Sequence, residues 1–185
     1  MSDTGKQTRV ARRSVIAAAL VASFSSRAAA QDGPPLPPPL NELRAVGLTD
    51  TDGAAMTLGE ALLPERASVI SFWATWCAPC AAEARHLARM RERIAPERLN
   101  IVGINVDQRR VEARISQFLE RAGVNYEQLR GDLAAYQSFG GGAQIVLPRL
   151  FIFYPDGRPL TAFGRYVQFV TLRQVDRAVE RAMAA

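Results

Sequence analysis

The sequence predicts an α/β fold in which a central β-sheet of mixed direction is flanked by helices, with a β-hairpin extension on its N-terminal side. Short apolar runs, typical of buried strands, alternate with longer segments whose apolar residues recur every three or four positions, as in helices. These segments follow one another in the order β-α-β-α and then β-β-α. The length of 185 residues, 48% of them hydrophobic and 22% charged, fits one globular domain with additional segments.

The first expected elements are a hairpin and a buried strand. Residues 43–48 and 54–58 are expected to form the hairpin, because the turn sequence Asp-Thr-Asp-Gly at 50–53 lies between them. Residues 59–63 favour one short helical turn. Residues 68–74 are apolar on both faces, which predicts a central strand.

A helix, a strand and a second helix follow in the sequence. Residues 77–94 have the apolar spacing of a helix, and Pro96 prevents its continuation. Residues 99–106 predict a second core strand. Residues 109–122 predict an amphipathic helix, with Gly123 as its C-terminal cap.

The C-terminal part predicts a second hairpin and a last helix. Residues 126–129 favour a short extended segment and residues 133–139 a short helix. The strands 150–154 and 160–166 are expected to pair around the turn at 155–158. The last helix is predicted by the helical spacing of Leu172, Val175, Ala178, Val179 and Ala182.

The N-terminal 30 residues have the layout of an export signal. Arg12 and Arg13 end a basic stretch, and residues 15–24 form an apolar run that is too short to span a bilayer, which takes about 20 residues. A small-residue cleavage site ends at Ala30, so we expect cleavage after this residue. The adjacent arginines favour the twin-arginine export route. The alternative is an uncleaved helix that lies at a membrane interface.

The positive charge of the chain is concentrated in this leader. The formal net charge is +5, and residues 1–30 contribute +4 of it, with five basic residues against Asp3. Residues 31–185 therefore carry only +1, which argues against a nucleic-acid partner. Residues 31–40 are rich in proline and favour a semi-rigid polyproline linker. The globular domain is expected over residues 41–185.

The two cysteines of the chain, Cys77 and Cys80, follow the expected central strand directly. The strand would deliver Cys77 to the N-terminus of the next helix, where free N–H groups and the helix dipole stabilise a thiolate. A stabilised thiolate beside a second thiol is suited to disulfide exchange. A zinc site, a structural staple and two inert thiols are the alternatives. However, zinc takes four ligands, and closing so short a loop stabilises a fold by only about 2 kcal/mol.

The string Phe-Trp-Ala-Thr-Trp-Cys-Ala-Pro-Cys at 72–80, together with the order of elements, resembles the thioredoxin superfamily. The leader, the hairpin sequence Leu-Thr-Asp-Thr-Asp-Gly at 48–53 and the position of Glu83 are similar to its exported branch, the TlpA/ResA-type thiol–disulfide oxidoreductases. The resemblance covers about residues 40–183 and implies a thioredoxin-like fold for them.

This resemblance implies roles for the residues around the cysteines. Cys77 would be the attacking thiolate, exposed at the mouth of the helix, and Cys80 the shielded resolving thiol, with Trp76 and Pro79 shaping an apolar docking surface. Independently of the resemblance, a thiol one helical turn inside is placed to attack a mixed disulfide formed at Cys77.

Further supporting residues lie outside this string. The resemblance places a cis-proline at Pro148 against the disulfide, preceded here by Leu147, where many relatives carry threonine or valine. Glu83 is associated with tuning the pair and relaying its proton, and partial burial would raise its pKa; the alternative is a first-turn glutamate that complements the helix dipole. Ser71 stands where thioredoxins place a buried aspartate. His86 is expected to be a surface or partly buried residue without a catalytic role.

The expected function is that of an exported thiol–disulfide oxidoreductase, periplasmic or otherwise outside the cytoplasm. Ala78 and Pro79 between the cysteines favour a reductase of protein disulfides, in cytochrome c or cytochrome oxidase assembly or in general thiol reduction; a thiol oxidase runs the same chemistry in the opposite direction. The expected partners are protein thiols and disulfides and a membrane or periplasmic electron donor, with the chain acting as a monomer. We expect no metal, and no cofactor besides the Cys77–Cys80 disulfide.

Two other activities fit parts of this pattern. A copper metallochaperone of thioredoxin-like fold is the main alternative, because thiolates bind Cu(I). Such carriers use a wider cysteine spacing and a distant loop histidine, whereas this chain has the short spacing and the single histidine His86. A peroxidase is the third interpretation, but Ala74 stands where peroxiredoxins place a threonine.

Overall fold

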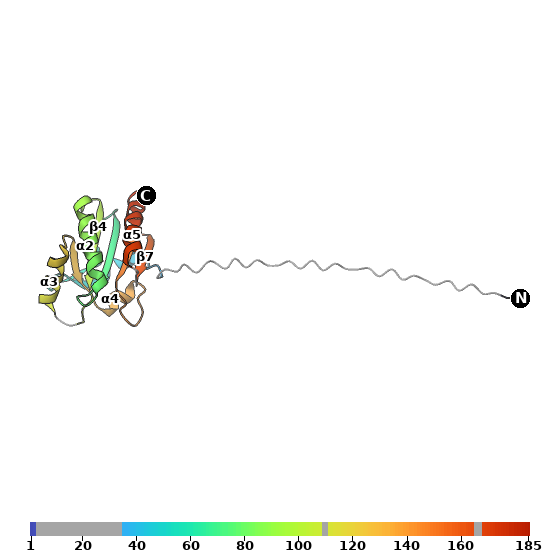
Figure 1. Ribbon diagram of the computed structural model, residues 1–185, viewed down its shortest axis with the longest axis horizontal. Helices are drawn as coiled ribbons and strands as arrows, with labels where there is room; N and C mark the ends of the chain where they lie inside the picture. The colour runs from blue at the N-terminus through green and yellow to red at the C-terminus, as the bar shows by residue number, and fades with distance from the viewer. Residues whose placement is uncertain (3–34, 109–110, 165–167) are drawn as a thin grey trace. The chain divides into compact units, whose positions relative to one another are not determined.

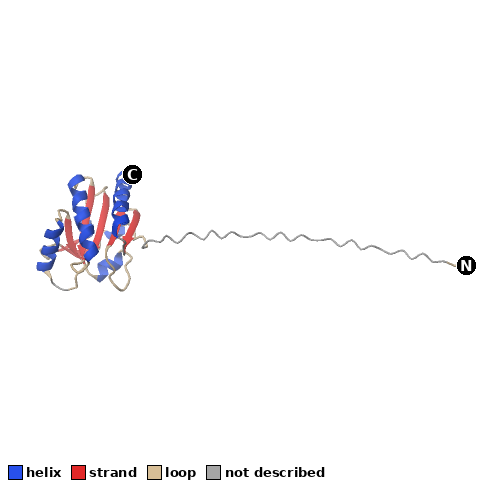
Figure 2. Ribbon diagram, viewed as in Figure 1, coloured by secondary structure: helices blue, strands red, loops and turns tan. Residues whose placement is uncertain are grey.

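A seven-stranded sheet with helices on both faces forms the folded part of the chain (Figures 1 and 2). The computed structural model describes residues 1–2, 35–108, 111–164 and 168–185. The strands are β1 (Gly47–Thr49), β2 (Ala55–Thr57), β3 (Ala67–Trp73), β4 (Leu99–Asn105), β5 (Glu127–Arg130), β6 (Arg149–Phe153) and β7 (Pro159–Gly164). The helices are α1 (Leu40–Leu43), α2 (Ala78–Arg93), α3 (Glu112–Ala122), α4 (Leu133–Ser138) and α5 (Gln168–Met183), with a 3-10 turn, η1 (Leu58–Ala61).

The sheet has mixed direction, as the sequence predicts. Its strand order is β2-β1-β5-β4-β3-β6-β7. The strands β3, β4 and β5 pair in parallel, whereas β6 pairs with β3 and β7 with β6 in the antiparallel direction. The antiparallel hairpin of β1 and β2 joins the sheet through β5. The expected central sheet with an N-terminal hairpin is therefore confirmed.

Some element bounds differ from those expected. Leu43 ends the short helix α1 rather than starting a strand, because Leu40 and Leu43 both turn into the core. The second long helix begins at Glu112, and residues 109–110 lie outside the described residues, as does Tyr166 at the end of the last expected strand. Residues 3–34, which hold nearly all of the expected export signal, also lie outside them.

The strands β3 and β4 form the centre of the sheet. All seven residues of each strand are buried, which explains why their sequences are apolar on both faces. Successive side chains of a strand point to opposite faces, so each strand contributes to two separate cores. The end of β3 is therefore held rigidly where the chain leaves the sheet toward α2.

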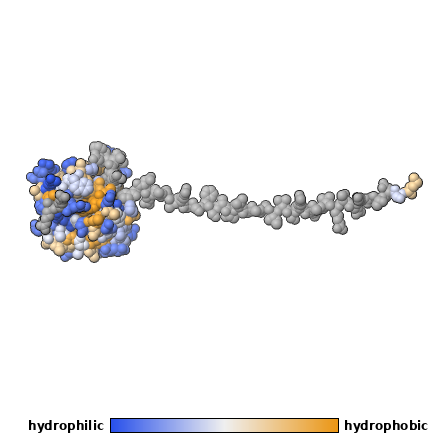
Figure 3. All heavy atoms as spheres, turned by 90° about the horizontal axis from the view of Figure 1, so that it is seen from below, coloured by the Kyte–Doolittle hydropathy of each residue, from blue (hydrophilic) through white to orange (hydrophobic). Residues whose placement is uncertain are grey.

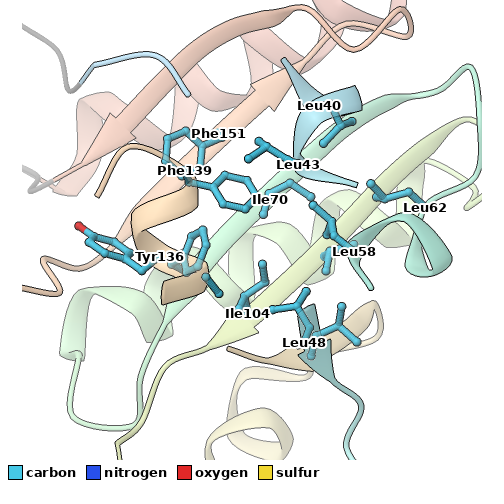
Figure 4. Close-up of a cluster of buried hydrophobic side chains, with 14 of the residues drawn as sticks. Leu40, Leu43, Leu48, Leu58, Leu62, Ile70, Ile104, Tyr136, Phe139 and Phe151 are labelled. Carbon is cyan, nitrogen blue, oxygen red and sulfur yellow. The ribbon is translucent and has the colours of Figure 1, made fainter. Parts of the chain in front are cut away.

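One core lies on the face covered by α1, η1 and α4 (Figure 4). Aromatic rings from three elements meet there. Phe72 of β3 makes edge-to-face contacts with Tyr136 of α4 and with Phe151 of β6, at centroid distances of 5.5 and 6.2 Å. Such pairs add about 0.5–1.5 kcal/mol each beyond the area that they bury. This packing fixes α4 and the loop after it beside the end of β3.

The other face carries α2, α3 and α5. Leu87 and Met90 of α2 and Val175 and Val179 of α5 pack with apolar residues of β3, β4 and β6. The ring of Phe118 in α3 stacks on Trp73 at the end of β3, with centroids 4.3 Å apart. This contact holds α3 beside the first turn of α2.

Seen from the end of the domain at which α4 lies, hydrophobic residues gather in one patch among hydrophilic residues (Figure 3). Within the described ranges, no helix is long and apolar enough to cross a membrane.

Candidate active site

The two cysteines lie at the junction between β3 and α2, and they form a disulfide with an S–S distance of 2.02 Å. Cys77 is the N-cap of α2, and its Sγ accepts a hydrogen bond from the backbone N–H of Cys80 at 3.3 Å. Pro79 lies in the first turn of the helix, where its missing N–H has no cost. The expected placement of Cys77 at the helix N-terminus is confirmed. After reduction, the same N–H and the helix dipole would face a thiolate at Cys77.

The exposure of Cys77 differs from the sequence expectation. Cys77 was expected at an exposed position, but in the disulfide it is only 4% exposed, and Cys80 is 1% exposed. Both cysteines form a small apolar cluster with Trp73, and side chains of α3 and the side chain of Leu147 pack against this cluster. The expected exposure follows from the position at the helix end alone. The side chains that cover Cys77 come from α3 and from Leu147, which lie far from it in the sequence.

Trp76, which directly precedes Cys77, is 63% exposed. A large aromatic side chain beside a disulfide, open to solvent, is available to a docking molecule. Its expected exposure is confirmed, and its role in docking stays a prediction. Thr75, which directly precedes Trp76, is held by Asp107. The carboxylate of Asp107 accepts hydrogen bonds from the N–H of Thr75 at 2.9 Å and from its hydroxyl at 3.1 Å.

The peptide bond between Leu147 and Pro148 is cis, as expected. Pro148 directly precedes β6, which pairs with β3. The loop before it is held by Tyr136, whose hydroxyl donates to the carbonyl of Val146 at 3.2 Å. These contacts bring Leu147 against the cysteine cluster, although the two segments lie about 70 residues apart in the chain.

Glu83 is a buried carboxyl on the second turn of α2 and is 5% exposed. Burial raises its pKa to about 7, and the hydrogen bond from the hydroxyl of Ser71 to its Oε1, at 2.6 Å, opposes this rise. The alternative of a first-turn glutamate that complements the dipole is wrong, because the first turn of α2 holds no acidic residue. A carboxyl with a pKa near neutrality can both accept and release a proton at physiological pH.

The phenol of Tyr126 lies near Glu83. The pKa of Tyr126 is raised, first because its phenol is buried and second because Glu83 lies near it. Ser71, at the position where thioredoxins carry a buried aspartate, is also buried and is 4% exposed. From the sequence, a serine at this position cannot store a proton. The sequence did not reveal that the hydroxyl of Ser71 would donate a hydrogen bond to Glu83, whose carboxyl can store one.

Two other polar residues near the site have structural contacts. The Nε2 of His86 lies 2.9 Å from Oδ1 of Asp176 in α5, so the partly buried position expected for His86 is confirmed. Arg149, directly after the cis-proline, was missed in the sequence. Its guanidinium lies over the rings of Tyr136 and Phe151 at 5.7 and 5.2 Å, and its buried Nε and Nη2 have no hydrogen-bond partner in the described residues. An arginine within an otherwise apolar strand was the available signal.

No group of three or more histidine, cysteine, aspartate or glutamate side chains placed to hold a metal ion occurs in the part of the chain that the structure describes. The candidate site in that part is the Cys77–Cys80 disulfide, with the buried Glu83 on the same helix.

Comparison with known proteins agrees with this geometry. A secreted disulfide oxidoreductase of Mycobacterium tuberculosis, homologous to DsbE of E. coli, has a similar structure (TM-score 0.61, 20% identity, covering 76% of this chain and 98% of that one). So does a secreted thiol-disulfide isomerase of Corynebacterium glutamicum (TM-score 0.64, 21% identity, 77% and 86% covered). A thioredoxin-family thiol:disulfide interchange protein of Chlorobium tepidum is a third (TM-score 0.60, 21% identity, 82% and 99% covered).

These similarities show that the described domain has the thioredoxin-like fold, as the sequence predicts. No curated protein sequence matches the chain significantly. A profile of the AhpC/TSA family matches residues 40–158, which make up more than half of the chain and include β3, the disulfide and the cis-proline. The chain belongs to the AhpC/TSA family of thioredoxin-like proteins.

Proposed function

We propose that this chain is a thiol–disulfide oxidoreductase that reduces disulfides in partner proteins. The observation that carries the proposal is the closed Cys77–Cys80 disulfide at the N-terminus of α2, with the sulfur of Cys77 at the N-cap. A disulfide with this placement is in equilibrium with a dithiol whose first member is stabilised as a thiolate.

The exchange begins with the reduced chain. The thiolate of Cys77 attacks one sulfur of a partner's disulfide, so a mixed disulfide forms and the second partner sulfur leaves as a thiolate that takes up a proton. Cys80 then loses its proton and attacks the sulfur of Cys77. The mixed disulfide breaks, the partner leaves with two thiols, and two electrons have passed to it from the chain.

Glu83 is the group best suited to receive the proton of Cys80. It lies three residues after Cys80 in α2, and this spacing places both side chains on one side of the helix. Its pKa of about 7 leaves roughly half of the carboxyl ionised near neutrality, so a proton acceptor is available. Return to the dithiol form needs an electron donor, which we propose to be a membrane or exported dithiol protein.

The direction of the reaction is supported by the residues between the cysteines. Ala78 and Pro79 are similar to the pair in reducing members of the superfamily. Reduction potentials in this fold range from about −270 mV for reductants to about −120 mV for oxidants. We expect a potential in the lower half of this range, and a measured value above about −150 mV would show a thiol oxidase instead.

The test uses insulin, a protein with accessible disulfides, and the chain reduced by dithiothreitol. Wild type should accelerate insulin reduction, whereas Cys77→Ser should abolish the acceleration. Cys80→Ser should form a mixed disulfide with insulin without turning over. If Cys77→Ser retains full activity, the assigned chemistry is wrong. Hydrogen peroxide in place of insulin tests the peroxidase alternative, for which Ala74 lacks the expected hydroxyl.

We also propose that residues 1–30 direct the chain out of the cytoplasm and are removed after Ala30. The basic stretch, the short apolar run and the small residues before the cleavage point support this proposal. An oxidising compartment supplies the disulfides on which such an enzyme acts. N-terminal sequencing of the mature protein should begin at Gln31, and a mature protein that begins at Met1 or Ser2 would contradict cleavage.

A further inference from the structure

A groove of about 690 Å³ lies between α2 and α3, next to the disulfide. Thr75 and Trp76 line its end at the disulfide, since Trp76 immediately precedes Cys77. Phe118 and Ile145 contribute apolar surface to it. A segment of polypeptide that occupies this groove would therefore continue directly past the redox centre.

The groove has a marked excess of positive charge. Arg85 of α2 and Arg114 and Arg121 of α3 line it, and all three side chains belong to exposed residues. None of the three guanidinium groups makes a hydrogen bond or an ion pair within the described ranges of the chain. Asp107 is the single acidic residue among the described residues of the lining, so these residues together carry a formal charge of two positive units.

Asp107 forms no ion pair with these arginines, and its carboxylate oxygens accept hydrogen bonds from other groups. Oδ2 accepts from the backbone N–H of Thr75 at 2.9 Å and from Nδ2 of Asn105 at 2.8 Å. Oδ1 accepts from the hydroxyl of Thr75 at 3.1 Å. The arginines are therefore free to bind anionic groups brought by another molecule, and guanidinium groups bind carboxylates in two-pronged hydrogen bonds.

The spacing of the arginines fits an extended peptide. Arg114 and Arg121 are seven residues apart in α3, so their backbones lie about 10 Å apart on one side of the helix. Acidic residues two positions apart in an extended chain lie on one side of it, about 7 Å apart, and the long arginine side chains span the remaining difference. Arg85 faces them from the opposite wall of the groove, on α2.

We propose that this groove binds an acidic, extended segment of the partner protein, adjacent to the disulfide that is exchanged. Charge complementarity with the three arginines carries this proposal, and the exposed ring of Trp76 supplies an apolar contact at the end nearest the cysteines. The inference rests on the proposed disulfide reduction, and it names the class of substrate: proteins whose redox-active cysteines are flanked by aspartate and glutamate.

The test compares three synthetic peptides that contain the same disulfide, with flanking residues that are acidic, neutral or basic. The full chain, reduced beforehand, should reduce the acidic peptide in a single exchange with a second-order rate constant at least about tenfold above that for the basic peptide, because several weak charge pairs add up. Raising the salt concentration from about 50 to 500 mM should remove most of this preference, since salt screens exposed charges.

The variant Arg85→Glu/Arg114→Glu/Arg121→Glu should reverse the preference, so that the basic peptide becomes the better substrate. The matched control reverses three exposed arginines of α5 that lie outside the groove lining, with the same change in net charge, and should keep the acidic preference; its substitutions are Arg173→Glu, Arg177→Glu and Arg181→Glu. If the groove variant does not fold, the salt dependence of wild type and the triple Arg→Gln variant still decide the question.

The two proposals fail in different ways. Equal reduction of all three peptides by wild type would overturn the groove assignment and leave the disulfide reductase intact. Loss of the acidic preference in both variants to the same extent would show a general charge effect and would also overturn it. Failure to reduce any of the peptides, or insulin, would refute the proposed function itself. Preferential reduction of oxidised glutathione over every peptide would show that the arginines serve a small anionic disulfide instead.

Discussion

Replacing Glu83 with glutamine should remove a pH dependence of stability that this carboxyl imposes on the folded domain. Burial raises the pKa of Glu83 to about 7, while the hydrogen bond from Ser71 opposes the rise. In the unfolded chain the same carboxyl titrates near its ordinary value of about 4.3. The folded state therefore holds this proton more tightly, so the stabilising contribution is complete at low pH and is lost as the pH rises through 7.

The size of the effect follows from these two values. Their difference corresponds to about 3.5 kcal/mol in total, of which about 2.5 kcal/mol is lost between pH 5 and pH 8. Urea unfolding of the oxidised wild type and of Glu83→Gln, measured across this range, gives the free energy of unfolding of each. Glutamine does not titrate, and its carbonyl can still accept the hydroxyl of Ser71.

The comparison isolates one carboxyl because other titrating groups, such as the His86–Asp176 pair, are present in both proteins. Relative to the variant, wild type should lose about 2.5 kcal/mol from pH 5 to pH 8, so the difference in stability should shift by this amount in favour of Glu83→Gln. A difference between the two proteins that stays constant within about 0.5 kcal/mol would refute the raised pKa, and with it the role of Glu83 as a proton acceptor.

Three other perturbations test neighbouring contacts. Ser71→Ala removes the donor that favours the carboxylate, so Glu83 should titrate at a higher pH than in wild type in the same unfolding series; an unchanged midpoint would contradict this. Leu147→Ala should speed reduction of the disulfide by dithiothreitol several-fold, because Leu147 packs against the cysteine cluster, whereas Val146→Ala, at a 43% exposed position next to it, should not. Equal rates for the two variants would show that Leu147 does not restrict access. Phe118→Ala removes the ring stacked on Trp73 and should cost about 2 kcal/mol of stability in urea unfolding, and a loss below about 0.5 kcal/mol would contradict the importance of this contact.

Local patterns were sufficient to predict most of the fold. The central strands β3 and β4 are mostly apolar on both faces, and the helices α2 and α5 show their period in the chain itself. The placement of Cys77 at the N-cap of α2 followed from the strand that precedes it. The start of α1 did not follow, because the burial of Leu40 and Leu43 depends on the tertiary core and not on a period within four residues.

The environment of the site was less predictable, for the same reason. The bond between Ser71 and Glu83 joins a strand to a helix, and neither residue type alone indicates the other. The burial of Cys77 depends on Leu147 and α3, which come from other parts of the chain. The arginines of the groove lie on two helices, and their common orientation becomes visible only when α2 and α3 are packed side by side.

The most direct test of the central claim compares the two cysteines as nucleophiles, one at a time. The single-thiol variants Cys80→Ser and Cys77→Ser are reacted with a small aromatic disulfide at pH 6, and the release of the coloured thiol gives the rate for each sulfur. Both cysteines are buried in the disulfide, but the sulfur of Cys77 faces the N–H of Cys80 and the end of the helix dipole, whereas Cys80 lies inside the first turn. We expect Cys80→Ser to react at least about a hundredfold faster than Cys77→Ser, since an N-cap thiol is largely ionised at a pH where an ordinary thiol is not. Equal rates, or a faster reaction at Cys80, would contradict the assignment of Cys77 as the attacking residue.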